Sequence, residues 1–514
     1  MAASADVALI LEGTYPYVAG GVSTWVHQIL SAYPERRFAL LHIGPHPGAY
    51  GKPLFAMPSN VTGMHEVHCR GTELVGRRKP PRSPPAPTRR APSRVLAALR
   101  RIHLGHEVDD QLLADLASGD LTIHEFLHGD ATFDLLHRDL YEKLSPDAPF
   151  MDFFWHMRAM HIPLLRLLAA GCPEASVYHA VSTGYAGLIG AVASFKTGRP
   201  LVVTEHGLYA REREMELSRA TWIKDLDPRR LGSALPSPLR RLWSHYFRAL
   251  SRIAYHQASL LITLSDANRA KQLADGASPA KILVVPNGVK WPGLPRPATA
   301  PAPELPPPPL PEIPPALAPE VRSAPAPFRI GFVGRVVPIK DVITLIRAVA
   351  LAREQVDLEL WIIGPEEEDA IYARRCHALV TSLELDADVR FLGSQPTADL
   401  YPQLDVVVLT SLSEGQPLVI LEAYAAGVPV VATDVGACRE LLEGGDEQDR
   451  LLGPSGIVTR VANPTATAAA ICTLARHPEL RAAMGRAALA RVAARYQLQQ
   501  VVASYDSLYN AMVG

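Results

Sequence analysis

Short apolar runs alternate with amphipathic stretches along most of the chain. In the second half the apolar runs lie in FRIGFVGR, DLELWIIG, VRFLG, DVVVLTS, PVVATDVG and SGIVTRV, and helical patterns such as DVITLIRAVALARE and PLVILEAYAAG stand between them. Near-continuous Val, Ile and Leu runs are typical of parallel strands covered on both faces. The pattern therefore predicts an α/β domain with a doubly wound parallel sheet.

The first half shows the same alternation more loosely, in DVALIL, RFALLHIG, SVYHAV, RPLVVTEHG, ASLLITLS and KILVVPNG. A chain of 514 residues is too long for one core, so we expect two domains, at residues 1–290 and 328–490. Residues 75–165 interrupt the first domain with a basic, proline-rich run and then helical patterns. A last helical pattern at residues 491–514 shows a break near Tyr496.

Residues 291–327 separate the two domains and contain 15 prolines. Such a segment has little to bury and favours extended polyproline conformations, so we interpret it as a linker or insert. The net charge of −1 gives no general attraction to nucleic acid or to anionic membranes. The five cysteines are scattered, and the N-terminus has no basic region before its apolar run. We therefore expect a cytoplasmic protein without nucleic-acid partners.

The second predicted domain has polar residues at two strand ends. Arg335 and Lys340 follow FRIGFV, and Glu414–Gly415–Gln416 follows VVVLTS, just before a helix predicted to start at Pro417. The free N–H groups of a helix start and the two cations suit a diphosphate. Glu422 lies further into this helix, where a carboxylate can accept hydrogen bonds from ribose hydroxyls. The sequence predicts a nucleotide-diphosphate site here.

The first predicted domain offers fewer candidates. His206 lies just beyond the strand in LVVTEHG, and Gly20–Gly21 follows the first strand, where bare backbone lets a ligand approach. His179 lies within a strand and is better explained as structural. The DAD at residues 386–388 lies in a turn, where Asp is common, so we expect no metal site. The sequence contains no Walker, HExxH or GxSxG motif.

Several long stretches resemble the retaining glycosyltransferases of family four, which have the GT-B fold of two Rossmann-like domains with a cleft between them. They are LILEGTYPYVAGGVSTWVHQ, VYHAVSTGYAGLIGA, TEHGLYARERE, FVGRVVPIKD and SEGQPLVILEAYAAGVPVVATDVGACREL. Together they look most like the transferases of Pel exopolysaccharide synthesis in biofilm-forming bacteria. The resemblance covers nearly the whole chain except the proline insert and the basic run.

The resemblance implies roles for the site residues. The donor would be a UDP-sugar, and Arg335 and Lys340 would hold its diphosphate. Glu422 would bind the ribose. Glu414 and His206 would contact the sugar. The backbone of Gly20, Gly21 and residues 415–418 would line the phosphates. Glu12, Tyr15 and Tyr17 would either line the acceptor side or, for the two tyrosines, pack against the long insertion. The last helix would cross back onto the first domain.

The resemblance also implies the activity and its partners. The protein would transfer a hexose or N-acetylhexosamine to a growing exopolysaccharide, with retention of the anomeric configuration. The reaction would need no metal or other cofactor. An inner-membrane synthase complex could recruit the protein. The catalytic set would be His206, Arg335, Lys340 and Glu414. One departure is Lys290, where the family often has Asp after PNGV. The alternatives are a GT-B epimerase of UDP-sugars and a non-catalytic nucleotide-sugar sensor or scaffold.

Overall fold

The structure is a computed structural model that describes residues 5–71, 93–223, 237–290 and 327–513. The chain forms two compact units: unit 1 comprises Met1–Thr263, Ala270–Leu283 and Asp506–Gly514, and unit 2 comprises Leu264–Arg269 and Val284–Tyr505. Each unit is built on a parallel sheet, which confirms the predicted fold class. In the described ranges, no helix has both the length and the apolar content needed to cross a membrane.

The sheet of unit 1 has seven strands in the order β3-β2-β1-β4-β5-β6-β7. Its central strands are apolar and buried; for example, Val7 to Leu11 in the first strand are all 0% exposed. The strands are β1 Ala5–Glu12, β2 Phe38–Gly44, β3 Val61–His68, β4 Ala175–Ala180, β5 Leu201–Glu205, β6 Leu260–Thr263 and β7 Ile282–Val284.

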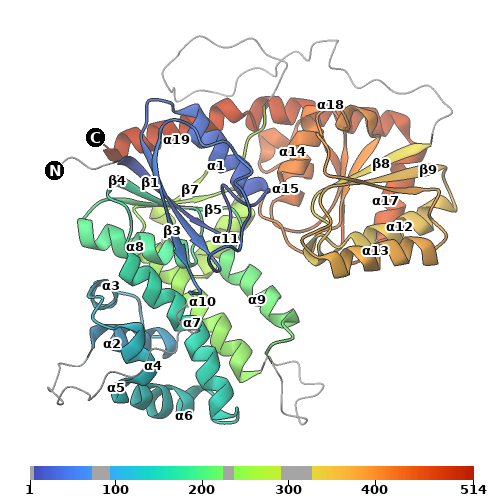
Figure 1. Ribbon diagram of the computed structural model, residues 1–514. Helices are drawn as coiled ribbons and strands as arrows, with labels where there is room; N and C mark the ends of the chain where they lie inside the picture. Colours follow the sequence, from blue (N-terminus) through green and yellow to red (C-terminus); the bar gives the residue numbers. More distant parts are fainter. Residues whose placement is uncertain (1–4, 72–92, 224–236, 291–326, 514) are drawn as a thin grey trace. The chain divides into compact units, whose positions relative to one another are not determined.

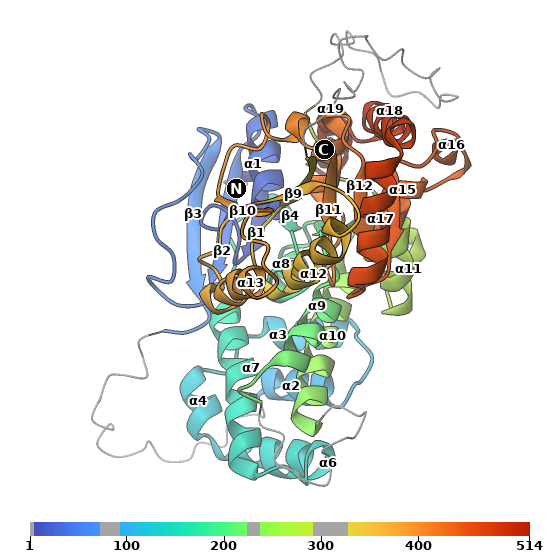
Figure 2. The same cartoon turned by 90° about the vertical axis from the view of Figure 1, so that its right-hand side faces the viewer.

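Helices connect these strands and form the insertion of unit 1. Figures 1 and 2 both place α2, α4 and α6 together, away from the strands of this unit. The elements are α1 Gly21–Ala32, α2 Arg94–His103, α3 Asp110–Ala117, α4 Ile123–His128, α5 Asp130–Asp134, the π-helix η2 Leu135–Tyr141, α6 Glu142–Leu144, α7 Phe150–Ala170, α8 Tyr185–Thr197, α9 Tyr209–Arg219, α10 Pro238–Gln257, α11 Asp266–Ala274 and the short 3₁₀ turn η4 Pro279–Lys281.

The sheet of unit 2 has six strands in the order β10-β9-β8-β11-β12-β13. All six correspond to the apolar runs recognised in the second half of the sequence, because each run is short, rich in β-branched residues and bounded by turn residues. They are β8 Phe328–Val333, β9 Leu358–Ile363, β10 Val389–Gly393, β11 Val406–Leu409, β12 Val430–Thr433 and β13 Gly456–Thr459.

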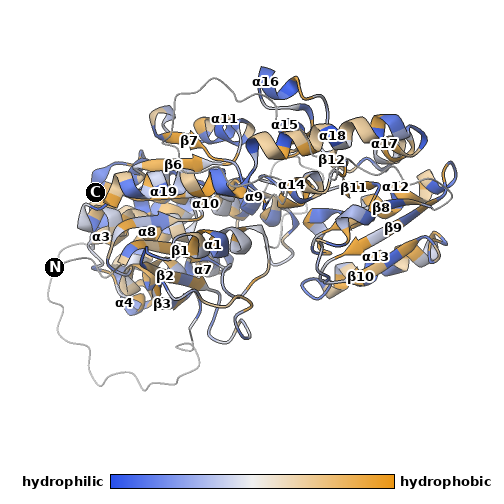
Figure 3. Ribbon diagram, turned by 90° about the horizontal axis from the view of Figure 1, so that it is seen from above, coloured by the Kyte–Doolittle hydropathy of each residue, from blue (hydrophilic) through white to orange (hydrophobic). Residues whose placement is uncertain are grey.

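Alternate residues of these strands enter two separate cores. Ile330, Leu360 and Val408 join the cluster that contains α12 and α13, whereas Trp361 and Val407 join the cluster that contains α14 and α18. Figure 1 shows α12 and α13 on one face of the sheet and α14 and α18 on the other, and Figure 3 shows β8 coloured largely as hydrophobic. The sheet is therefore covered on both faces, as its unbroken apolar runs predict.

The remaining elements of unit 2 are helices and short 3₁₀ turns. They are η6 Pro338–Lys340, α12 Val342–Arg353, α13 Ala370–Ser382, η7 Tyr401–Gln403, α14 Leu418–Ala425, α15 Cys438–Glu443, α16 Glu447–Arg450, α17 Pro464–Arg476, α18 Pro478–Arg495 and α19 Leu498–Val513, whose last residues belong to unit 1.

The structure differs from the sequence interpretation in a few places. The strand β3 was not predicted, because it lies at the sheet edge and its residues alternate only weakly between partly buried and exposed positions. Helix α14 begins at Leu418, and Pro417 is its N-cap. The proline-rich segment up to residue 326 and the basic run at residues 75–92 lie outside the described residues.

Candidate functional site

In unit 2 the candidate residues gather where the strand order of the sheet reverses. The chain passes from β8 outward through β9 and β10, and then returns to β11 on the other side of β8. The carboxyl ends of two such strands leave a crevice in which open α/β sheets bind ligands. Arg335 and Lys340 follow β8, and Glu414 follows β11, so all three belong to this position.

Lys340 and Glu414 are in direct contact. The Lys340 ammonium lies 2.5 Å from Oε1 of Glu414, and the Ser411 hydroxyl donates to the same oxygen over 2.6 Å. Both side chains of the ion pair are mostly buried, with 19% of Lys340 and 11% of Glu414 exposed. The structure thus places a cation and a carboxylate together at the crevice.

Main-chain contacts hold the two loops that carry this pair. The Leu412 N–H donates to the carbonyl of Ile339 over 2.8 Å, and the Thr410 hydroxyl donates to the carbonyl of Asp341 over 2.9 Å. Asp341 has a φ of 46° and caps the start of α12, which turns the chain sharply after Lys340. The position of Lys340 therefore depends on local backbone geometry as well as on its ion pair.

Gly436 fits closely against the loop that contains Glu414. A Cβ atom at position 436 would lie 2.1 Å from the carbonyl oxygen of Glu414 and 2.4 Å from that of Gly415. The neighbouring Ala437 N–H donates to the Gly415 carbonyl over 2.8 Å. Only glycine permits this close approach. The contact at Gly436 and the hydrogen bond from Ala437 together fix the backbone just before α14.

Arg335 has a different partner from Lys340. Its Nη1 lies 2.5 and 2.7 Å from the two carboxylate oxygens of Glu368, in the loop after β9. Both side chains are exposed, so the pair is open to solvent and to an incoming anion. The sequence analysis did not select Glu368, although its acidic run, EEED, follows an apolar strand at the same edge of the sheet.

Glu422 lies in α14 and is bound by Tyr401. The Tyr401 hydroxyl donates to Oε2 of Glu422 over 2.6 Å. Burial raises the pKa of Glu422, and the hydrogen bond from Tyr401 acts in the opposite direction. Within the described residues, the other carboxylate oxygen has no hydrogen-bond donor, so it is available to a ligand hydroxyl.

The segment from Gln416 to Leu418 connects the loop to α14. Gln416 is 6% exposed, and its side-chain oxygen and its carbonyl accept hydrogen bonds from the main chain and the side chain of Asn287, at 2.5 and 3.1 Å. The Gln416 side chain is thus engaged within unit 2, whereas Pro417 and Leu418 supply the helix start. A ligand would meet this segment through its backbone.

Unit 1 has its own reversal of strand order, between β1 and β4. Glu12 ends β1, Gly20 is the N-cap of α1, and Gly21 is the first residue of that helix. Both glycines are exposed, and nothing lies within 4 Å of a Cβ atom built at Gly20. The backbone at the start of α1 is therefore open to a ligand, as the sequence predicts for Gly20–Gly21.

His206 follows β5 and packs against α1. Its ring lies edge-on to Trp25, with the ring centroids 4.7 Å apart. Its Nε2 is buried and has no hydrogen-bond partner among the described residues. Burial lowers the pKa of His206 to about 4, so the imidazole is neutral near pH 7. A buried nitrogen without a partner is uncommon in proteins and is consistent with a functional group.

Glu12 is held by hydrogen bonds from two other parts of unit 1. The Tyr209 hydroxyl, at the start of α9, donates to Oε1 of Glu12 over 2.9 Å, and the Ala186 N–H donates to Oε2 over 3.4 Å. Burial, followed by the negative charge of Glu12, raises the pKa of Tyr209. This carboxylate thus joins β1, α8 and α9, and Tyr209 is a site neighbour that the sequence analysis did not select.

The two candidate tyrosines differ. Tyr15 is 0% exposed and packs against Phe55 and His27, with ring centroids 5.2 and 6.0 Å away. Its ring cannot stack on a sugar, and these neighbours do not belong to the long insertion, so both interpretations of Tyr15 are wrong. Tyr17 is only partly buried; it stacks on Tyr50 at 5.3 Å and donates a hydrogen bond to Glu66.

Two family models match the chain. Residues 5–280 match a family described as a domain of unknown function, DUF3492. Residues 327–477 match the family described as glycosyl transferases group 1.

Curated relatives match parts of the chain. The MMP alpha-(1->4)-mannosyltransferase of Mycolicibacterium hassiacum is 29% identical over 266 residues, which are 51% of this chain and 55% of the relative. The D-inositol 3-phosphate glycosyltransferase of Kineococcus radiotolerans is 35% identical over 247 residues, 46% of this chain and 53% of the relative. The N-acetyl-alpha-D-glucosaminyl L-malate synthase of Bacillus anthracis is 30% identical over 172 residues, 33% of this chain and 42% of the relative. The chain thus spans about half the length of these relatives.

Solved structures resemble the whole chain. HepE from Anabaena, in complex with UDP-glucose, has a TM-score of 0.56 at 17% identity and covers 98% of this chain and 99% of its own. Sucrose-phosphate synthase from Thermosynechococcus elongatus has a TM-score of 0.58 at 15% identity and covers 98% of both chains. At these identities the similarity shows the fold, which is that of the GT-B glycosyltransferases.

Proposed function

The chain belongs to the DUF3492 family, whose model matches residues 5–280, and its residues 327–477 match the model of the group 1 glycosyl transferases. From this we propose that it transfers a sugar from a nucleotide-sugar donor to an acceptor hydroxyl. The observation that carries the proposal is the Lys340–Glu414 pair at the strand-order reversal of unit 2. A cation for a phosphate and a carboxylate for sugar hydroxyls are there held side by side, at the edge where such sheets bind nucleotides.

The donor in this proposal is a UDP-sugar carrying a hexose or N-acetylhexosamine. Lys340 and Arg335 bind the diphosphate, the latter by exchanging Glu368 for a phosphate oxygen. The N–H groups at the start of α14 add to this site, and Glu422 accepts hydrogen bonds from the ribose. HepE, which shares the fold, is known in complexes with UDP and UDP-glucose, which supports UDP as the first nucleotide to test.

Unit 1 contributes groups for the sugar and the acceptor in this proposal. His206 bonds the donor sugar through its neutral imidazole, and the open backbone at Gly20 and Gly21 lies along the ligand. Glu12 and the partly exposed Tyr17 remain candidates for the acceptor side. Tyr15 is no longer a candidate, because its side chain is fully buried. The role of each is a hypothesis that substitution tests.

We propose a retaining reaction. The bond between the anomeric carbon and the phosphate oxygen lengthens, and the charge that grows on the leaving diphosphate is stabilised by Lys340 and Arg335. The acceptor oxygen forms its bond on the same face as the leaving group departs, and its proton passes to the departing phosphate oxygen. Exclusion of water limits donor hydrolysis. With two cations at the diphosphate, the proposal requires no metal.

The acceptor in this proposal is a growing exopolysaccharide. The support is the sequence resemblance of stretches such as residues 9–28 and 413–441 to Pel-type transferases. The finer assignment is a PelF-type enzyme that works in the cytoplasm beside an inner-membrane synthase. The mannosyl- and glycosyltransferase names of the curated relatives are compatible with this class but concern other acceptors.

Substitution of Lys340 tests the activity. We expect Lys340→Ala to lower the rate of UDP release from a UDP-sugar in the presence of acceptor by about 100-fold or more, because the departing diphosphate loses a positioned cation. The matched control is Lys196→Ala, which removes an exposed lysine at the end of α8. Far-ultraviolet circular dichroism should show that both variants are folded.

Three outcomes would contradict the proposal. A Lys340→Ala enzyme with wild-type turnover would show that this residue does not bind the diphosphate. UDP binding without any turnover would favour the non-catalytic sensor or scaffold. Conversion of the UDP-sugar into its epimer without acceptor would favour the epimerase.

A further inference from the structure

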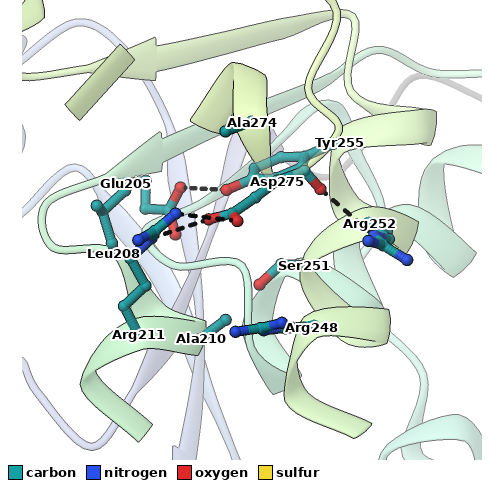
Figure 4. Close-up of a pocket in the computed structure, with 10 residues that line it drawn as sticks. All are labelled: Glu205, Leu208, Ala210, Arg211, Arg248, Ser251, Arg252, Tyr255, Ala274 and Asp275. Atoms are coloured by element: carbon teal, nitrogen blue, oxygen red, sulfur yellow. Dashed lines mark hydrogen bonds and ion pairs between the residues drawn. The ribbon is translucent and has the colours of Figure 1, made fainter. Parts of the chain in front are cut away.

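A pocket in unit 1 is lined by three arginines that the proposed reaction does not use. Figure 4 shows it between the end of β5, the start of α9, the helix α10 and the end of α11. Arg211 comes from α9, and Arg248 and Arg252, four residues apart, lie on the same face of α10. The guanidinium groups of Arg248 and Arg252 are exposed, so a ligand can reach them from solvent.

The acidic residues at this pocket leave one guanidinium without a carboxylate. Asp275 binds Arg211 through two contacts of 3.1 Å, and Glu214 binds Arg248 at 2.6 Å. Arg252 donates only to the main-chain carbonyl of Asp275, over 3.4 Å, and has no carboxylate within ion-pair distance in the described ranges. Figure 4 shows this contact beside the Arg211–Asp275 pair.

The fifth charged residue of the pocket, Glu205, is occupied by other groups. Its carboxylate accepts hydrogen bonds from Tyr255 at 2.8 Å, Gln272 at 2.7 Å and Thr183 at 2.9 Å. It is 1% exposed, and burial raises its pKa. Glu205 therefore connects the pocket wall to Tyr255, Gln272 and Thr183, and its carboxylate oxygens are occupied by these donors.

A histidine on the same helix lies close to two of the three arginines. His245 lies on α10, about one turn before Arg248 and about two turns before Arg252. Its pKa is lowered first by burial and then by the positive charges of Arg252 and Arg248. The positive charges of Arg248 and Arg252 therefore also act on the His245 ring.

The pocket is separate from the surroundings of His206. Glu205 is the last residue of β5 and His206 is the residue after it, and their side chains contact different helices. Glu205 contacts α10 and α11, whereas His206 contacts Trp25 on α1. A ligand bound by the three arginines would therefore lie on the other side of β5 from the histidine.

We propose that Arg211, Arg248 and Arg252 form a binding site for a phosphoryl group. Guanidinium groups present paired N–H donors that match the oxygens of a phosphate, and they stay charged at every physiological pH. Arg252 supplies the uncompensated charge, and Arg248 and Arg211 can each turn donors toward the same anion. The proposal does not depend on the glycosyltransferase activity. The shared chemistry is the phosphoryl group, whether it is free phosphate or the monoester of a larger ligand.

Calorimetric titration with sodium phosphate, at constant ionic strength set by chloride, tests the site. We expect saturable binding to the full-length protein, and binding at least about tenfold weaker in Arg252→Gln, because losing one hydrogen bond to a charged group typically changes an affinity by that factor or more. The control Arg138→Gln removes an exposed arginine that pairs with Asp134 one turn away, and it should bind as wild type does.

Phosphate could also bind where we place the donor diphosphate, so the titration is repeated with Lys340→Ala. Phosphate binding that is retained in Lys340→Ala and weakened in Arg252→Gln supports the arginine pocket. This conclusion holds whether or not the protein is a glycosyltransferase. Binding that is lost in Lys340→Ala and unchanged in Arg252→Gln overturns it. If Arg252→Gln is not folded by circular dichroism, Arg248→Gln replaces it with the same expectation.

A parallel titration with glycerol 3-phosphate distinguishes the two sources of the anion. Tighter binding of the monoester would identify the phosphoryl group of a larger ligand, and tighter binding of inorganic phosphate would identify the free ion; both support the site. Absence of saturable binding for both compounds would overturn the proposal.

Discussion

Lys340 and Glu414 form one ion pair although 74 residues separate them, and this contact is the centre of the account at the scale of single residues. Their position at one edge of the sheet was predictable, because both are polar residues directly beyond apolar strands that end at the same edge. Which of the two cations would meet the carboxylate was not predictable. Arg335 pairs with Glu368 instead, and that choice depends on a loop after a different strand.

Tyr15 shows where reasoning from single residues fails. An aromatic residue near a strand end was a reasonable candidate for contact with a sugar, but Phe55 and His27 bury it completely. These two residues come from a loop and a helix whose positions the strand pattern does not specify. The sequence alone therefore could not predict that Tyr15 is buried.

The low pKa of His206 predicts a pH-dependent stability. Its folded-state pKa of about 4 lies below the usual 6.5, so between these values the unfolded chain binds more protons than the folded one. The stability of the wild type should therefore fall as the pH decreases from 6.5 toward 4. The variant His206→Gln lacks this group and should lose less stability over the same range.

Urea denaturation of both proteins between pH 4.5 and 7.5 measures this difference. Other buried histidines, such as His161 and His179, are present in both proteins and cancel in the comparison. Stability curves that run parallel over the whole range would show that His206 is not held neutral by burial.

At the scale of helices and strands, the reversal of strand order places the candidate residues. The reversals between β1 and β4 and between β8 and β11 bring Glu12, Lys340 and Glu414 to the carboxyl ends of central strands. The apolar runs predict the strands, and the chemistry at their ends predicts the sites. The edge strand β3 could not be predicted in the same way, because few of its residues enter the core.

The loop before α14 gives a prediction at this scale. Gly436 and the Glu414 carbonyl approach each other because α15 starts beside that loop, and sequence spacing does not reveal such proximity. We expect Gly436→Ala to weaken UDP binding at least about tenfold, because the new methyl group must displace the backbone at Glu414 and Gly415. Calorimetric titration with UDP measures the effect.

Gly453→Ala is the matched control for this prediction. Gly453 also has a positive φ, of 82°, but nothing lies within 4 Å of a Cβ atom built there. It therefore reproduces the backbone strain of an alanine without the collision. Equal UDP affinities for the two variants would mean that the contact between Gly436 and the loop does not matter for binding.

At the scale of the whole chain, the last residues return to the unit formed by the first. Asp506–Gly514 belongs to unit 1, where Asp506 and Asn510 bind Arg36 at 3.0 and 2.7 Å. Tyr509 is 0% exposed, and its hydroxyl lies 2.6 Å from Nδ1 of His179. This contact explains why His179 is structural, as the sequence analysis inferred.

Substitution of Tyr509 should destabilise unit 1. We expect Tyr509→Ala to lower its free energy of unfolding by about 3 to 5 kcal/mol, because a large buried ring is replaced by a cavity. The control Asn510→Ala changes an exposed neighbour and should cost less than about 1 kcal/mol. Urea denaturation followed by tryptophan fluorescence measures both, and a wild-type midpoint for Tyr509→Ala would show that this packing is unimportant.

The central claim of the account is that unit 2 binds the nucleotide of a sugar donor, and a thermal-shift titration with UDP, GDP and ADP tests it most directly. We predict selective stabilisation by UDP, of about 2.7 kcal/mol at 100 times its dissociation constant. Glu422→Ala should lose most of the stabilisation, and Glu354→Ala, which changes an exposed carboxylate at the end of α12, should keep it. Absence of a shift with any of the three nucleotides, or an equal shift for wild type and Glu422→Ala, would contradict the donor site.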